Sequence, residues 1–167
     1  MAFLPTSKRV VFDTNALFRF RVRALIADLA QTGTIQPLWS SRTVEELRAV
    51  LRARAMPDAE VFLNQFQASI VTPAPLPLSA KGFRDPGDLH VIEAALSADA
   101  SLIVTSNARD FPLRQLRPLG LDRVSIDAFF AAHATALQSP DHQPDDLRRA
   151  RLSQTAKAIS SLVANHG

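Results

Sequence analysis

Cysteine is absent from the 167 residues of this chain. Disulfide scaffolds, thiolate metal sites and cysteine nucleophiles are therefore excluded. Long hydrophobic runs are absent too, because no segment approaches the roughly 18 consecutive apolar residues of a membrane-spanning helix. The opening residues, "MAFLPTSKRVVF", contain no basic segment followed by a long apolar stretch. We therefore expect a soluble, cytoplasmic protein without a membrane partner.

Charge of one sign is also scarce. The chain has 19 Lys and Arg against 16 Asp and Glu, which gives a net charge of +3 at pH 7. So small an excess is compatible with a nucleic-acid partner but does not indicate one by itself. Hydrophobic residues make up 47% of the chain, so a folded core rather than disorder is expected.

Two short apolar runs predict buried strands. "RVVF" at residues 9–12 and "SLIVT" at residues 101–105 are continuous and rich in β-branched side chains, as buried parallel strands are. The first run leads into Asp13 and the second into a turn that contains Asp110. Segments with apolar residues at helical spacing lie between them. This alternation predicts an α/β fold with a parallel sheet.

Capping residues predict where two helices begin. Thr43 and Glu46 have the spacing of a capping box, although a start one turn earlier, at Ser40 or Ser41, fits equally well. Asp88 suits the start of the helix "LHVIEAAL".

The C-terminal part has its own pattern. A short strand is expected at residues 124–126, followed by a helix from about Asp127. "QSPDHQPDD", residues 138–146, has the composition of a linker, and residues 147–167 have the apolar spacing of one final helix.

Several carboxylates fall at the predicted ends of strands and helices. If the sheet is parallel, the carboxyl ends of its strands open on one edge, and Asp13 and Asp110 become neighbours. Clustered carboxylates repel one another unless a cation offsets them, and Mg²⁺ and Mn²⁺ prefer such oxygen ligands. No histidine pair, Ser-His-Asp set or Gly-rich phosphate loop competes, so metal-assisted attack on a phosphoryl centre is indicated. Singly, each acid also has a structural interpretation as a turn residue, a cap or a loop charge. The acids are Asp13, Glu46, Asp85, Asp88 and Asp110.

The motifs resemble, in the same order, those of the PIN domain: "VVFDTNALF", "TVEELRAVL", "DPGDLHVIEAAL" and "IVTSNARDFP". The resemblance covers Val10 to about Pro112 and extends loosely to Phe130. It implies a three-layer α/β/α fold with a central, mostly parallel sheet in residues 1–137, with a linker and C-terminal helix in residues 138–167. It also implies an Mg²⁺- or Mn²⁺-dependent ribonuclease, most often the toxin of a VapC-type toxin–antitoxin pair. RNA, a cognate antitoxin and a second copy of the chain are then the expected partners.

By position, the resemblance makes Asp13 the first metal-binding acid, with Asn15 ordering the loop around it. Glu46 corresponds to the helix glutamate, and Glu45 replaces it if the register is shifted by one. Asp88 resembles the third acid, with Asp85 as an outer partner.

The fourth motif departs from the family pattern. Many members have Thr-x-Asp after the second strand, whereas this chain has Thr105, Ser106 and Asn107. Asn107 can bind a metal or water through its carbonyl but adds no charge, so Asp110 would supply it. The resemblance thus implies catalysis by Asp13, Glu46, Asp88 and Asp110, with Asn107 as a further metal ligand and with Asn15, Thr105 and Asp85 in support.

Two other functions compete with this one. A PIN-like RNA-binding or scaffold protein that has lost turnover is favoured by Asn107. A haloacid-dehalogenase-like phosphatase also begins with a strand ending in Asp, but it needs a second acid where this chain has Asn15. Its later lysine motif is not matched, because Lys81 lies too close in sequence to Asp85 and Asp88.

Other side chains near the motifs have simpler interpretations. His90 follows Asp88 by two positions, which on a helix point to different faces, so we expect it to face solvent or to contact RNA. Trp39 is expected in the core. Arginines after the Asp13 turn can bind a phosphate backbone together, although each one singly is expected to be solvated: Arg19, Arg21 and Arg23.

Overall fold

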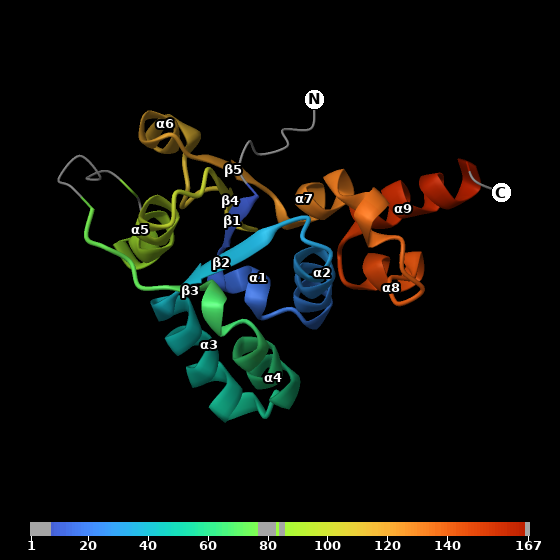
Figure 1. The fold of residues 1–167 in the computed structure, drawn as a ribbon, viewed down its shortest axis with the longest axis horizontal. Coiled ribbons are helices and arrows are strands. Elements are labelled where there is room, and N and C mark those ends of the chain that lie inside the picture. Colours follow the sequence, from blue (N-terminus) through green and yellow to red (C-terminus); the bar gives the residue numbers. More distant parts are fainter. Residues whose placement is uncertain (1–7, 77–82, 84–85, 166–167) are drawn as a thin grey trace.

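The computed structural model describes residues 8–76, 83 and 86–165, and it contains one five-stranded sheet (Figure 1). The strand order is β3-β2-β1-β4-β5, and every neighbouring pair is parallel. All five strands therefore present their carboxyl ends on one edge. The strands are β1 (Arg9–Phe12), β2 (Gln36–Ser40), β3 (Ile70–Val71), β4 (Leu102–Val104) and β5 (Asp122–Val124).

Helices cover both faces of this sheet, which confirms the predicted three-layer α/β/α fold. Val11 of β1 packs with Val91 and Ile92 of α5 on one face. Val10 and Phe12, which alternate with Val11, pack on the other face with α2, α3 and α7. The helices are α1 (Thr14–Leu17), α2 (Phe20–Gln31), α3 (Ser41–Arg54), α4 (Pro57–Gln65), α5 (Leu89–Ser97), α6 (Leu113–Leu116), α7 (Ile126–Ala132), α8 (Pro144–Arg149) and α9 (Ser153–Asn165).

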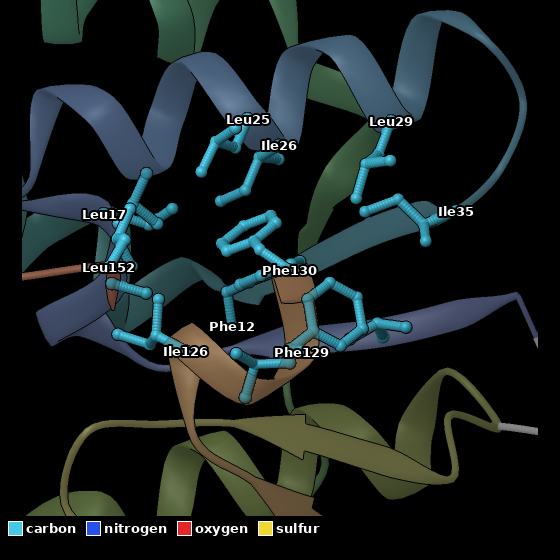
Figure 2. Packing of buried hydrophobic residues seen from close by; sticks show 14 of the residues in the cluster. Phe12, Leu17, Leu25, Ile26, Leu29, Ile35, Ile126, Phe129, Phe130 and Leu152 are labelled. Carbon is cyan, nitrogen blue, oxygen red and sulfur yellow. The ribbon is translucent and has the colours of Figure 1, made fainter. Parts of the chain in front are cut away.

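The larger core lies between β1 and the helices α2 and α7 (Figure 2). Phe12 makes an edge-to-face contact with Phe129 of α7, with ring centroids 5.6 Å apart and planes at 87°. Leu25, Ile26 and Leu29 cover these rings from α2. Trp39 of β2 is fully buried in the same core, as predicted.

The C-terminal residues form two helices instead of the expected single one. The chain turns between α8 and α9 at Arg151, whose φ is +59°. Leu152 then packs in the larger core beside Leu17 and Ile126 (Figure 2). Asp127 stabilises the start of α9, because its carboxylate accepts hydrogen bonds from the backbone of Gln154 and Thr155, each at 2.9 Å.

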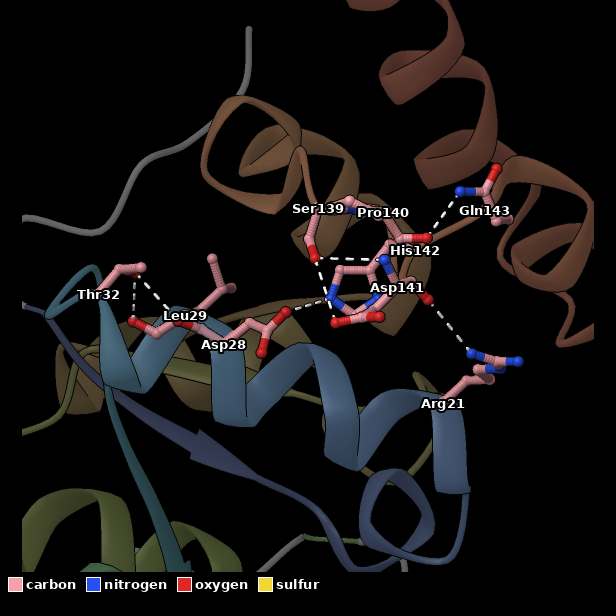
Figure 3. A network of polar contacts seen from close by, with 9 residues as sticks. All are labelled: Arg21, Asp28, Leu29, Thr32, Ser139, Pro140, Asp141, His142 and Gln143. Atoms are coloured by element: carbon pink, nitrogen blue, oxygen red, sulfur yellow. Dashed lines mark hydrogen bonds and ion pairs between the residues drawn. The ribbon is translucent and has the colours of Figure 1, made fainter.

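Residues 138–143, expected as a linker, are held against α2 by polar contacts (Figure 3). His142 is buried and its Nε2 pairs with the Asp28 carboxylate. Arg21 donates to the backbone oxygen of Asp141 at 3.4 Å.

In the stretches that the structure describes, no helix has both the length and the apolar character of a membrane span.

Two features of the sheet differ from the sequence prediction: where its last strand ends, and the presence of β3. The last strand ends at Val124, two residues earlier than predicted, because Ser125 caps α7 by accepting a hydrogen bond from the Ala128 N–H at 3.2 Å. β3 was not expected, since only two residues, Ile70 and Val71, pair with the end of β2.

Candidate active site

Asp13 lies at the carboxyl edge of the sheet, directly after β1. Its backbone N–H donates to the Val104 carbonyl at 3.0 Å, so it continues the pairing of β1 with β4. Its Oδ1 accepts from the Thr14 N–H at 2.6 Å, and its Oδ2 accepts from the Thr105 hydroxyl at 2.8 Å. Asp13 therefore caps α1 and stands at the predicted edge, so its structural and positional interpretations both hold.

The surroundings of Asp13 disfavour its charged form. Asp13 is only 3% exposed, and this burial raises the pKa of its carboxyl. The negative charge of Glu46 raises the pKa further. Hydrogen bonds from Thr105, from the Thr14 backbone and from the Asn15 side chain lower the pKa but do not reverse the shift. A cation at this place would favour the ionised carboxylate.

Glu46 is directed toward the same loop from α3. The capping-box interpretation is wrong: Ser40 caps this helix, accepting a hydrogen bond from the Arg42 N–H at 3.1 Å. Glu46 is thereby left in the second turn, where its Oε2 accepts from the Thr14 hydroxyl at 2.8 Å. The neighbouring Glu45 is exposed, so the structure places Glu46 beside Asp13's loop.

Threonine hydroxyls connect this site, and the sequence did not predict a place in it for Thr14 or Thr43. Thr14 contacts Asp13 through its backbone and Glu46 through its side chain. Thr43 adds a hydroxyl 3.1 Å from that of Thr14. The signal available in the sequence was a Thr directly after the strand-ending Asp.

The residues after β4 extend the network. Thr105, which bonds Asp13, also accepts a hydrogen bond from the backbone N–H of Asn107 at 2.9 Å. The side-chain amide of Asn107 donates to Asp110. Asp13 and Asp110 are therefore connected through Thr105 and Asn107 on the same edge.

The start of α5 brings in a residue whose place was wrongly predicted. Asp88 ends the 3₁₀ turn η3 (Pro86–Asp88) and immediately precedes α5, whereas Asp85 lies outside the described residues. His90 does not face solvent; it is 6% exposed because the first turn of α5 packs against the end of β2. Its Nδ1 lies 2.9 Å from the Ser40 hydroxyl and its Nε2 lies 3.5 Å from Glu46 Oε1.

The donor set fits a hard divalent cation. Within the described ranges, no three acidic or histidine side chains are arranged to hold a metal ion, so the protein ligands to consider are two carboxylates. Two carboxylates, those of Asp13 and Glu46, are held close to each other by Thr14. Mg²⁺ commonly binds one or two carboxylates and keeps its other ligands as water. A carboxylate has about four acceptor positions, so the hydrogen bonds to Asp13 leave room for a cation.

The arginines after the Asp13 turn are engaged with the protein. Arg19 donates to the Ala150 carbonyl, and Arg21 forms an ion pair with Asp146 at 3.3 Å. Arg23 is buried and bonds Asp58. These contacts join α2 to α4 and to the C-terminal helices, so each of the three side chains has a structural role, and Arg23 is also buried.

A family model described as PIN domain matches residues 9–109 of the chain. The match covers more than half of the chain, from β1 to the turn after β4. It includes Asp13, Glu46, Asp88 and Asn107, and it ends one residue before Asp110. No curated protein and no solved structure matches the chain.

Proposed function

The chain belongs to the PIN domain family, whose members are typically nucleases that bind divalent metals, and from this premise we propose that it is an Mg²⁺- or Mn²⁺-dependent endoribonuclease. One observation carries the proposal: Thr14 links the carboxylates of Asp13 and Glu46 at the carboxyl edge of the sheet. An open parallel sheet commonly has its site at this edge.

In this proposal, Asp13 and Glu46 bind the cation directly, and Asp88 and Asp110 act on it through its bound water, which is the attacking nucleophile. Thr14 and Thr105 fix the two carboxylates that they bond, and Asn107 adds a carbonyl ligand. The bound cation would activate water and offset the charge that develops on the phosphate. A carboxylate of the same set takes up the proton that the water releases.

We place this activity in a cytoplasmic toxin of the VapC type, in keeping with the order of the PIN motifs. A cognate antitoxin would then cover the same edge and set a basic side chain against its acids. Self-association through a second copy belongs to this proposal as well.

The deciding experiment is cleavage of total RNA by purified protein with Mg²⁺ or Mn²⁺, compared with EDTA. Asp13→Asn should abolish the cleavage. Asp99→Asn is the matched control, because Asp99 is exposed and has a positive φ of 52°, which Asn tolerates. Cleavage that persists in EDTA or in Asp13→Asn would contradict the proposal.

A second candidate is a PIN-like RNA-binding protein without turnover. It is favoured by Asn107, which replaces an acid and donates its amide to Asp110. RNA binding without cleavage under either metal would support this candidate.

A further inference from the structure

His90 joins two layers of the fold at the candidate site. It belongs to α5, whose Val91 and Ile92 pack on one face of the sheet. Glu46 belongs to α3, whose apolar residues pack on the opposite face. His90 reaches the end of β2 between these layers, where Ser40 is both the last strand residue and the cap of α3.

The two polar neighbours of His90, Ser40 and Glu46, indicate which ring nitrogen carries the proton. An ionised carboxylate can only accept, so Nε2, which lies 3.5 Å from Glu46 Oε1, carries the proton, and Nδ1 accepts from the Ser40 hydroxyl at 2.9 Å. A neutral imidazole that accepts at Nδ1 has its proton on Nε2. This N–H faces Glu46 Oε1 at 3.5 Å.

His90 is the buried neighbour of that carboxylate oxygen. Arg42 also lies 3.6 Å from Oε1, but its side chain is 57% exposed and comes from the same helix as Glu46. Exposed pairs of this kind restrain a side chain only weakly. His90 is buried and is held by Ser40, so its ring has a fixed position relative to the site.

We propose that His90 is a positioning residue, which uses its Ser40-bound imidazole to orient the Glu46 carboxylate toward a divalent cation. The inference rests on the proposed function, because it assigns the cation to the pair Asp13 and Glu46. Partners that orient a metal ligand typically contribute about 10–100-fold to metal affinity.

The test is Mn²⁺ binding measured by calorimetry on the full chain. We expect His90→Ala to bind Mn²⁺ about 10-fold more weakly than wild type, and His90→Gln, which keeps an N–H donor, to recover part of the loss. His142→Gln is the control, since it alters another buried histidine whose partner is Asp28, and it should leave the affinity unchanged.

A double-mutant cycle separates positioning from a general loosening of the fold. In a Glu46→Gln background, His90→Gln should not reduce Mn²⁺ affinity further. RNA cleavage gives a second readout, because the His90→Gln defect should become smaller at saturating Mn²⁺. Thermal unfolding in EDTA identifies variants that fail to fold. If His90→Ala is one of them, the Mn²⁺ affinity of His90→Gln is compared with that of the wild type instead.

The outcomes are distinguishable. Wild-type affinity in the folded His90 variants, or equal losses in both backgrounds, overturns the positioning role and leaves the nuclease proposal intact. A wild-type chain that neither binds Mn²⁺ nor cleaves RNA overturns the proposed function, and the role of His90 with it.

Discussion

The hydroxyl of Thr14 donates a hydrogen bond to Glu46 Oε2 at 2.8 Å, across 32 positions of the sequence. The backbone N–H of the same residue donates to Asp13 Oδ1 at 2.6 Å. One threonine thus sets the relative position of two carboxylates, one from the end of β1 and one from α3.

Thr14→Val should weaken both the fold and the site. Valine keeps the shape but removes the hydroxyl, which leaves Glu46 and Thr43 each without one partner. A buried polar group left without its partner, as Thr43 would be, costs about 1–3 kcal/mol in the free energy of unfolding. Urea unfolding measures this loss and Mn²⁺ calorimetry measures the site. Thr14→Ser retains the hydroxyl and is the control; Mn²⁺ affinity that is the same in all three proteins would refute the linking role.

Asp13→Asn should stabilise the metal-free protein at neutral pH. The folded-state pKa of Asp13 is raised above its unfolded value, mainly by burial, so the folded state favours the protonated form. The stability that Asp13 contributes is therefore fully present below its unfolded pKa and is lost as the pH rises through its folded pKa.

Thermal unfolding in EDTA checks this sign. Asn lacks the charge, so the variant should have the higher Tm at pH 7, and the difference should shrink as the pH falls below the range where Asp13 ionises. For a chain of this size, about 2–4 °C corresponds to 1 kcal/mol. A lower Tm for Asp13→Asn at pH 7 would show that burial is not the dominant effect.

Mn²⁺ should raise the Tm of the wild-type protein and not that of Asp13→Asn. A ligand that binds only the folded state stabilises it by about 2.7 kcal/mol at 100 times its Kd. Scanning fluorimetry over a Mn²⁺ series, with Ca²⁺ as a comparison ion, gives the measurement. An equal rise in both proteins would place the cation elsewhere.

Leu152→Ala should destabilise the whole molecule, because Leu152 is fully buried in the larger core. Truncation of a buried leucine costs about 2–5 kcal/mol. Val163→Ala in α9 is the matched control, since Val163 is 64% exposed and should change stability by about 0.5 kcal/mol or less. Comparable effects in chemical denaturation would mean that the C-terminal helices do not share the core in solution.

Much of the scaffold could be predicted from local patterns. The β-branched runs at residues 9–12 and 101–105 form β1 and β4, because continuous apolar side chains suit a strand covered on both faces. The start of α3 could not be chosen from the sequence, since Ser40 and Thr43 are both good caps. The end of β2 decided it, and the last two residues of β2, Trp39 and Ser40, pair with β3.

The sequence by itself determined that residues 9–12 and 101–105 contain strands, and it put Asp13 at the end of the first strand. The tertiary structure decided which polar side chains meet there. Thr105 bonds Asp13 across 92 positions, and His90 contacts Ser40 across 50. Such contacts depend on the strand order and on which face each helix covers, and no local pattern of residues contains that information.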